Sequence, residues 1–140
     1  MLPVTGRGEK LMGQMLKMLR CKIHRATVTQ SDINYEGSIS ISPELLDTAG
    51  IFPFEAVQVW NVTNGARFET YAISGQPGST HICVNGAAAR LVTPGDMVIV
   101  AAFSYLDENE AVRHVPKNVF VDEHNRIVRV GPETPGPGAR

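Results

Sequence analysis

Short runs of alternating apolar and polar residues, separated by turn residues, extend through most of the chain. This period of two predicts strands over residues 21–29, 56–62, 66–74, 81–84, 118–121 and 126–130. The apolar run at residues 97–103 predicts a further, buried strand. About six short strands with one or two small helices indicate a mainly β domain, folded as a closed or nearly closed β-barrel.

One short helix is predicted over residues 42–50. Ser42 suits the N-cap, Pro43 suits the first helical position, and Gly50 suits the residue that ends the helix. Glu44 in the first turn complements the helix dipole.

Glycine and proline mark the turns between the strands. Asn64-Gly65 predicts a tight hairpin turn, and residues 93–96 predict a turn before the buried strand. The small residues at 86–88 either allow another backbone or a ligand to approach closely, or form an ordinary tight connection.

Two strands carry charged or aromatic residues on one face. In the strand at 21–29, Lys22 and His24 lie opposite Cys21 and Ile23, and from spacing alone a solvated face is the favoured interpretation. In the strand at 66–74, one face carries Arg67, Glu69, Tyr71 and Ile73, and the other carries Phe68, Thr70 and Ala72.

The length and composition favour one globular domain. The chain has 140 residues, of which 43% are hydrophobic, and 13 basic against 14 acidic residues give a net charge of -1. This balance argues against nucleic acid or an anionic membrane as partner. Two cysteines without zinc-site spacing fit a reducing cytoplasm, and we expect no metal, no signal peptide and no membrane span.

The two ends of the chain differ from its middle. Residues 1–14 lack a sheet period and predict an N-terminal extension, with Met1, Met12 or Met15 as the start. The barrel domain is expected over residues 15–125, and residues 126–140 are expected to form a C-terminal strand and a disordered tail from Gly131.

The hexapeptide Tyr35-Glu36-Gly37-Ser38-Ile39-Ser40 has two interpretations. Alone, it is best explained as a β-turn or the start of a strand. In the second interpretation, the chain cleaves itself between Gly37 and Ser38 and converts Ser38 into its own cofactor. The remaining motifs decide between the two.

Six segments together resemble the bacterial aspartate 1-decarboxylases, in their order and spacing. The resemblance covers about residues 15–122. Arg90 departs from it, because the family often has His there, and the N-terminal extension is longer than usual. The matching segments are Lys22-Ile23-His24-Arg25-Ala26-Thr27-Val28-Thr29, Tyr35-Glu36-Gly37-Ser38, Trp60-Asn61-Val62-Thr63-Asn64-Gly65-Ala66-Arg67-Phe68, Thr70-Tyr71-Ala72-Ile73, Val84-Asn85-Gly86-Ala87-Ala88-Ala89 and Pro94-Gly95-Asp96.

The resemblance implies a double-psi β-barrel that assembles as a cytoplasmic homotetramer, with active sites between neighbouring subunits. It implies decarboxylation of L-aspartate to β-alanine and CO2 for pantothenate and coenzyme A synthesis. It also implies a covalent pyruvoyl cofactor made from Ser38, with cleavage into a β chain of residues 1–37 and an α chain of residues 38–140.

Such a reaction needs an electron sink on the substrate nitrogen, which no ordinary side chain provides. In the family's pathway, Ser38 Oγ attacks the carbonyl of Gly37, and an ester, β-elimination and hydrolysis follow. Gly37 suits this step because glycine admits unusual backbone angles and leaves its carbonyl unobstructed. Thr70 and Asn85 match the family's polar residues near the step, although a strand hydroxyl and a turn amide are their plain interpretations.

The resemblance also assigns the substrate contacts. Arg67, Lys22 and His24 would recognise the carboxylates, Thr70 would also contact the substrate, and Tyr71 would return a proton to the carbon after CO2 leaves. Arg67 and Tyr71 lie about 13 Å apart along one strand, which favours a site between subunits. The family's remaining substrate contacts match Gly86, Ala87 and Ala88.

Two other functions remain open at this point. One is a barrel that binds a partner without processing itself, since a fold does not fix a function. The other is a pyruvoyl decarboxylase for a different amino acid. The sequence does not say whether a maturation partner is required.

Overall fold

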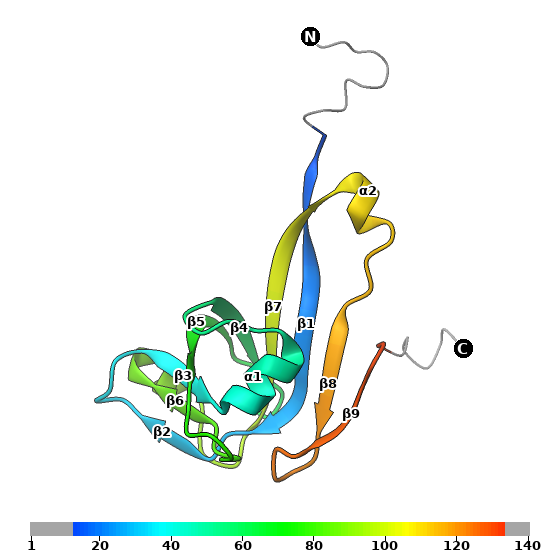
Figure 1. Cartoon of the computed structure of the whole chain (residues 1–140). Helices are drawn as coiled ribbons and strands as arrows, with labels where there is room; N and C mark the ends of the chain where they lie inside the picture. The colour runs from blue at the N-terminus through cyan, green and yellow to red at the C-terminus, as the bar shows by residue number, and fades with distance from the viewer. Residues whose placement is uncertain (1–12, 134–140) are drawn as a thin grey trace, which may run out of the picture.

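The protein, described here by a computed structural model over residues 13–133, is mainly β with three short helices, which confirms the predicted class (Figure 1). The predicted extension and tail lie largely outside the described residues. The strands are β1 (Met15–Thr27), β2 (Gln30–Asp32), β3 (Ser38–Ile41), β4 (Ala56–Asn61), β5 (Arg67–Ser74), β6 (Cys83–Asn85), β7 (Met97–Asp107), β8 (Lys117–Val121) and β9 (Ile127–Gly131). The helices are α1 (Pro43–Ala49), the 3₁₀ helix η2 (Gly86–Leu91) and α2 (Glu108–Ala111).

The strands form one mixed sheet in the order β2-β6-β3-β5-β4-β7-β1-β8-β9, consistent with a barrel. β1 lies between β7, which is antiparallel to it, and β8, which is parallel. β3 lies between β5, which is parallel to it, and β6, which is antiparallel. The parallel pairs, such as β1 with β8 and β3 with β5, join segments that are far apart in the sequence, as parallel pairing requires.

Two strands are longer than the sequence pattern predicts. β1 starts at Met15 and β7 continues to Asp107, and these two residues pair directly. The extra pairs form an arm that projects from the body of the molecule and carries α2 near its tip (Figure 1). The pattern within one strand does not reveal this length, because the arm depends on pairing between segments about 90 residues apart.

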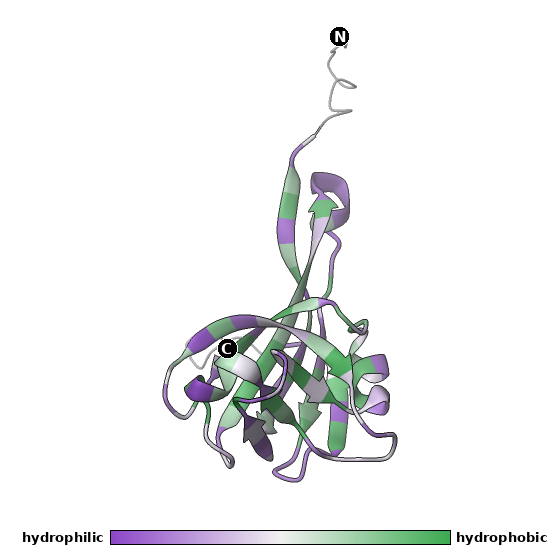
Figure 2. Cartoon of the chain, turned by 90° about the vertical axis from the view of Figure 1, so that its left-hand side faces the viewer, coloured by the Kyte–Doolittle hydropathy of each residue, from purple (hydrophilic) through white to green (hydrophobic). Residues whose placement is uncertain are grey.

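The predicted alternation separates core from surface. Ile23 on β1, Ile39 on β3, Val59 on β4, Val100 on β7 and Val119 on β8 have no exposed surface. Figure 2 shows hydrophobic and hydrophilic bands alternating along the strands. The expected faces of β5 are also found, because Ala72 is buried while Tyr71 is 36% exposed.

The local signals for α1 are confirmed. Ser42 Oγ accepts a hydrogen bond from Leu45 N at 3.3 Å, and Gly50 ends the helix with a φ of 84°. The hairpin between β4 and β5 is looser than predicted. Residues 62–66 separate the two strands, and Asn61 Oδ1 at the end of β4 accepts from the backbone N–H groups of residues 63 and 64.

Asn125 connects three separate parts of the sheet. It lies in the turn between β8 and β9, is 6% exposed and has a φ of 63°. Its Nδ2 donates to the carbonyls of Thr27 and Thr80 at 2.9 Å each, and its Oδ1 accepts from Thr27 N at 2.7 Å. One amide therefore fixes the end of β1 and the loop before β6 against this turn.

Replacing Asn125 tests this connection. Asn125→Gly removes three hydrogen bonds and should lower the free energy of unfolding by about 3 kcal/mol. Asn125→Ala should cost about 1 kcal/mol more, because alanine tolerates the left-handed backbone poorly. Urea unfolding at one fixed protein concentration measures both variants. Equal stability of the two variants would contradict the backbone part of this explanation.

Candidate active site

Three neighbouring strands line a cavity of about 720 Å³. β3, β5 and β6 each contribute two residues spaced by two, so that these side chains share one face of the sheet. These six residues are Ser38, Ser40, Tyr71, Ile73, Cys83 and Asn85. Gln30 at the start of β2 and the loop residues Asn34, Tyr35, Glu36 and Phe54 complete the lining.

Ser38 lines this cavity and is buried, with 3% of its surface exposed. It pairs directly with Asn85 of β6. Its hydroxyl accepts a hydrogen bond from Asn85 Nδ2 at 3.2 Å and donates to the carbonyl of Glu36 at 3.4 Å. The hydroxyl next to the Gly37 carbonyl is therefore held in a defined position.

Cys83 orients Asn85 and was not predicted as a site residue. Its thiol donates to Asn85 Oδ1 at 3.2 Å, which leaves Nδ2 to face Ser38. Burial, with the nearby carboxylate of Asp32, raises the pKa of the Cys83 thiol, so the group keeps the proton that it donates. The available sequence signal was only the spacing of two between Cys83 and Asn85 on one strand.

Gly86 allows two backbones to meet beside Ser38. Its φ is 76°, and a Cβ atom there would lie 2.5 Å from Gly37 Cα and 2.7 Å from Gly37 N. Gly37 itself is not among the glycines with a left-handed φ. The close approach expected over residues 86–88 occurs at Gly86, and Ala87 and Ala88 follow it in η2.

Tyr71 faces the cavity next to an aromatic residue in a strained conformation. The rings of Tyr71 and Phe54 lie 6.4 Å apart between centroids. Phe54 is 77% exposed and has a φ of 72°. A positive φ is unusual for a bulky residue. Such strain persists only where the surroundings impose it.

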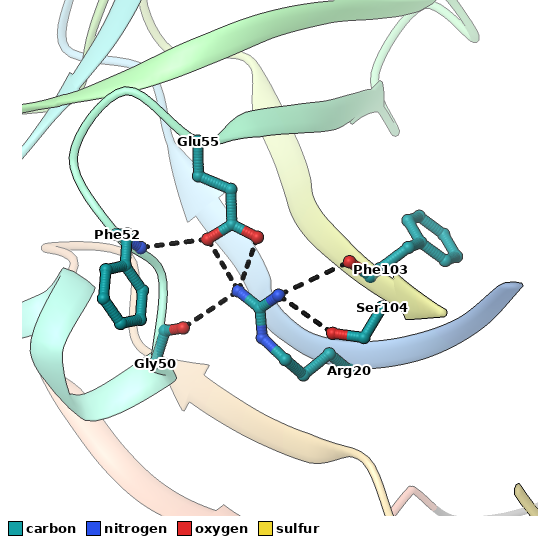
Figure 3. A network of polar contacts seen from close by, with 6 residues as sticks. All are labelled: Arg20, Gly50, Phe52, Glu55, Phe103 and Ser104. Carbon is teal, nitrogen blue, oxygen red and sulfur yellow. Dashed lines mark hydrogen bonds and ion pairs between the residues drawn. The ribbon is translucent and has the colours of Figure 1, made fainter. Parts of the chain in front are cut away.

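A polar network around Arg20 imposes this loop conformation (Figure 3). Arg20 Nη2 donates to Gly50 O at 2.9 Å and to Glu55 Oε1 at 2.6 Å, and Nη1 donates to Ser104 Oγ at 3.1 Å. Glu55 Oε1 also accepts from Phe52 N at 3.0 Å. The loop from α1 to β4 is thereby attached to β1 and β7 on both sides of Phe54.

Thr70 lies on the other face of β5 from Tyr71 and does not line the cavity. The pair Ile39 and Ala72 sets the register of β3 and β5. Counting back two residues on each strand leads from this pair to Gly37 and Thr70. The strand register thus places the Thr70 backbone beside Gly37, whereas the Thr70 side chain lies on the inner face of β5, with Ala72.

Lys22 and His24 line a different pocket, of about 200 Å³. Lys22 is 9% exposed, so the solvated face favoured from spacing is wrong for this residue. Its Nζ lies 3.2 Å from Glu133 Oε1. Burial and the positive charges of Lys22 and Arg25 lower the pKa of His24.

Arg67 lies outside both pockets, with its guanidinium 4.5 Å from the centre of the Trp60 ring. One chain therefore brings Ser38, Tyr71 and Asn85 together but does not bring Lys22, His24 or Arg67 to them. Within residues 13–133, no group of three or more His, Cys, Asp or Glu side chains could hold a metal ion. In the same range, no helix is long and apolar enough to cross a membrane.

Comparison with known proteins identifies a family to which the sequence is similar. Residues 14–128 match the sequence model of the family described as Aspartate decarboxylase. The chain is 61% identical over 124 residues to the aspartate 1-decarboxylase of Legionella pneumophila strain Paris, covering 89% of this chain and 93% of that one. It is 56% identical over 124 residues to that of Rhodopirellula baltica, covering 89% and 80%. It is 51% identical over 121 residues to that of Thioalkalivibrio sulfidiphilus, covering 86% and 96%.

The contact between Gly86 and Gly37 can be tested with a matched glycine. Gly78 has a φ of 77° and no atom within 4 Å of an added Cβ, so Gly78→Ala should cost only about 1 kcal/mol. Gly86→Ala adds overpacking against Gly37 and should cost about 2 kcal/mol more. Urea unfolding compares the two variants, and equal losses would show that position 86 tolerates a side chain.

Proposed function

The chain belongs to the aspartate decarboxylase family, and on that basis we propose that it converts L-aspartate to β-alanine and CO2 with a pyruvoyl group made from its own Ser38. The observation that carries this proposal is the buried Ser38 hydroxyl, held by Asn85 directly after Gly37. β-Alanine would then serve pantothenate and coenzyme A synthesis in the cytoplasm.

Self-cleavage would begin at Ser38. Its Oγ adds to the Gly37 carbonyl carbon, the peptide C–N bond breaks, and an ester replaces the amide. Loss of the Ser38 Cα proton then expels the Gly37 carboxylate, which separates residues 1–37 from 38–140 and leaves a dehydroalanine at position 38. Water adds to the imine form of this residue and ammonia leaves, so that the chain 38–140 begins with the pyruvoyl group. Asn85 Nδ2 already donates to Ser38 Oγ and so restrains the position of the attacking oxygen.

A pyruvoyl group at position 38 would supply the electron sink for decarboxylation, through a ketone that can react with an amine and an adjacent amide carbonyl that can accept electron density. The cavity of about 720 Å³ has room for a small amino acid beside this position. Tyr71 lines the same cavity, and its phenolic O–H group is a candidate proton donor. We assign to Tyr71 the protonation of the carbon that loses CO2.

The carboxylate-recognising residues would come from a neighbouring subunit. Lys22, His24 and Arg67 share no cavity with Ser38 within one chain, although the proposed substrate is small. We therefore assign the active site to an interface in a homo-oligomer, which we expect to be a tetramer. Residues 15–125 would form the decarboxylase domain, with Gly86, Ala87 and Ala88 along its substrate-binding edge.

Self-cleavage predicts two chains in purified protein. Intact-mass measurement after warm incubation should find masses for residues 1–37 and 38–140, the second with a blocked N-terminus. Ser38→Ala should give one uncleaved mass, because it lacks the attacking oxygen. A single mass for the wild-type chain would favour a barrel that binds a partner without processing.

Replacing Tyr71 separates cleavage from decarboxylation. Tyr71→Phe keeps the ring but removes the proton, so cleavage should proceed while β-alanine formation falls at least about 100-fold. Chromatography of the products from L-aspartate and from other amino acids measures this loss and the substrate preference together. Full activity of Tyr71→Phe would remove Tyr71 from the proton-transfer step.

A further inference from the structure

The pocket between β1 and β8 contains a residue, Asn118, to which the proposed function gives no role. It is built from two cross-strand pairs, Lys22 with Asn118 and His24 with Phe120, and Glu133 closes it. Its volume of about 200 Å³ suits a small acid group and the few carbons that carry it. Its lining includes one lysine, one neutral amide and one carboxylate.

Asn118 has no partner for its side chain within the described part of the chain. The residue has no exposed surface, and neither Oδ1 nor Nδ2 makes a hydrogen bond there. Leaving a buried amide unsatisfied costs about 1–3 kcal/mol, and such groups in native proteins require an explanation. Valine or leucine at this position of β8 would avoid that cost.

The pocket already accommodates a carboxylate. Glu133 Oε1 lies 3.2 Å from Lys22 Nζ, and the Lys22 side chain is only 11% exposed. A buried ammonium group needs a negative partner, because desolvation without one is costly. Glu133 is more than half exposed, at 54%, so it is an occupant that can leave.

We propose that Asn118 and Lys22 together bind a carboxylate of a small acid, and that Glu133 occupies this position until the acid replaces it. Asn118 Nδ2 would donate to the bound carboxylate, and Lys22 would contribute its charge. The identity of the acid as the substrate aspartate rests on the proposed function. Asn118 is thereby a further substrate-binding residue, and Glu133 an internal competitor.

Binding can be measured without the decarboxylation reaction. Full-length Ser38→Ala protein is titrated calorimetrically with succinate, a dicarboxylate that lacks the amino group. Adding Asn118→Leu should weaken succinate binding about tenfold, the effect of a lost hydrogen bond to a charged group. Adding Glu133→Gln should instead strengthen binding, because the internal carboxylate no longer competes.

A stability measurement and a second variant distinguish lost succinate binding from a failure of the variant to fold. Asn118→Leu should be at least as stable to urea as its parent, because it removes an unsatisfied amide. Asn118→Asp keeps the size and should bind succinate more weakly than Asn118→Leu through charge repulsion. If Asn118→Leu fails to fold, the effect of Asn118→Asp decides.

Three results would overturn the proposal. The first is unchanged succinate affinity in both Asn118 variants, and the second is unchanged affinity in Glu133→Gln. The third is the absence of succinate binding both to the Ser38→Ala protein and to the same protein carrying Glu133→Gln. Failure of the proposed function looks different, because it would appear as an uncleaved wild-type mass or absent β-alanine while succinate still binds. The two conclusions can therefore fail separately.

Discussion

The close contact between the backbones at Gly37 and Gly86 sets the geometry of the candidate active site. The pair Ser38 and Asn85 stands next to this contact, so any side chain at position 86 would separate β3 from the turn that follows β6. With that turn displaced, Asn85 could not reach the Ser38 hydroxyl. The position of the Ser38 hydroxyl thus depends on Gly86, which takes no part in the hydrogen bond itself.

Most features of the fold that depend on nearby residues could be predicted from the sequence, with the hairpin between β4 and β5 as an exception, and the features that depend on distant pairing could not. The caps of α1 and the faces of β5 follow from spacing and from single residues. The arm of β1 and β7 does not, because pairing of distant segments determines its length. The site divides in the same way: the family resemblance placed Ser38, Tyr71 and Asn85, but nothing in the pattern marked Asn118, which occurs in β8 as an ordinary polar strand residue.

The loop that carries Phe54 holds a strained backbone, and this strained loop places an aromatic ring beside Tyr71 at the cavity. Phe54 N donates to Ala72 O at 2.6 Å, one residue beyond Tyr71, so the strained backbone is hydrogen-bonded to the strand that carries the tyrosine. The Arg20 and Glu55 ion pair holds the other side of the loop. A half-exposed tyrosine gains a neighbouring ring and a restricted range of orientations from this arrangement.

The place of β1 in the sheet has a consequence for folding kinetics. β1 lies between β7 and β8, and it precedes the Gly37-Ser38 bond in the chain. An uncut chain can form these contacts in a unimolecular reaction, whereas two separate chains would have to find each other first. A cut chain that unfolds would therefore refold at a rate that depends on concentration, and its survival would rest on slow unfolding more than on equilibrium stability.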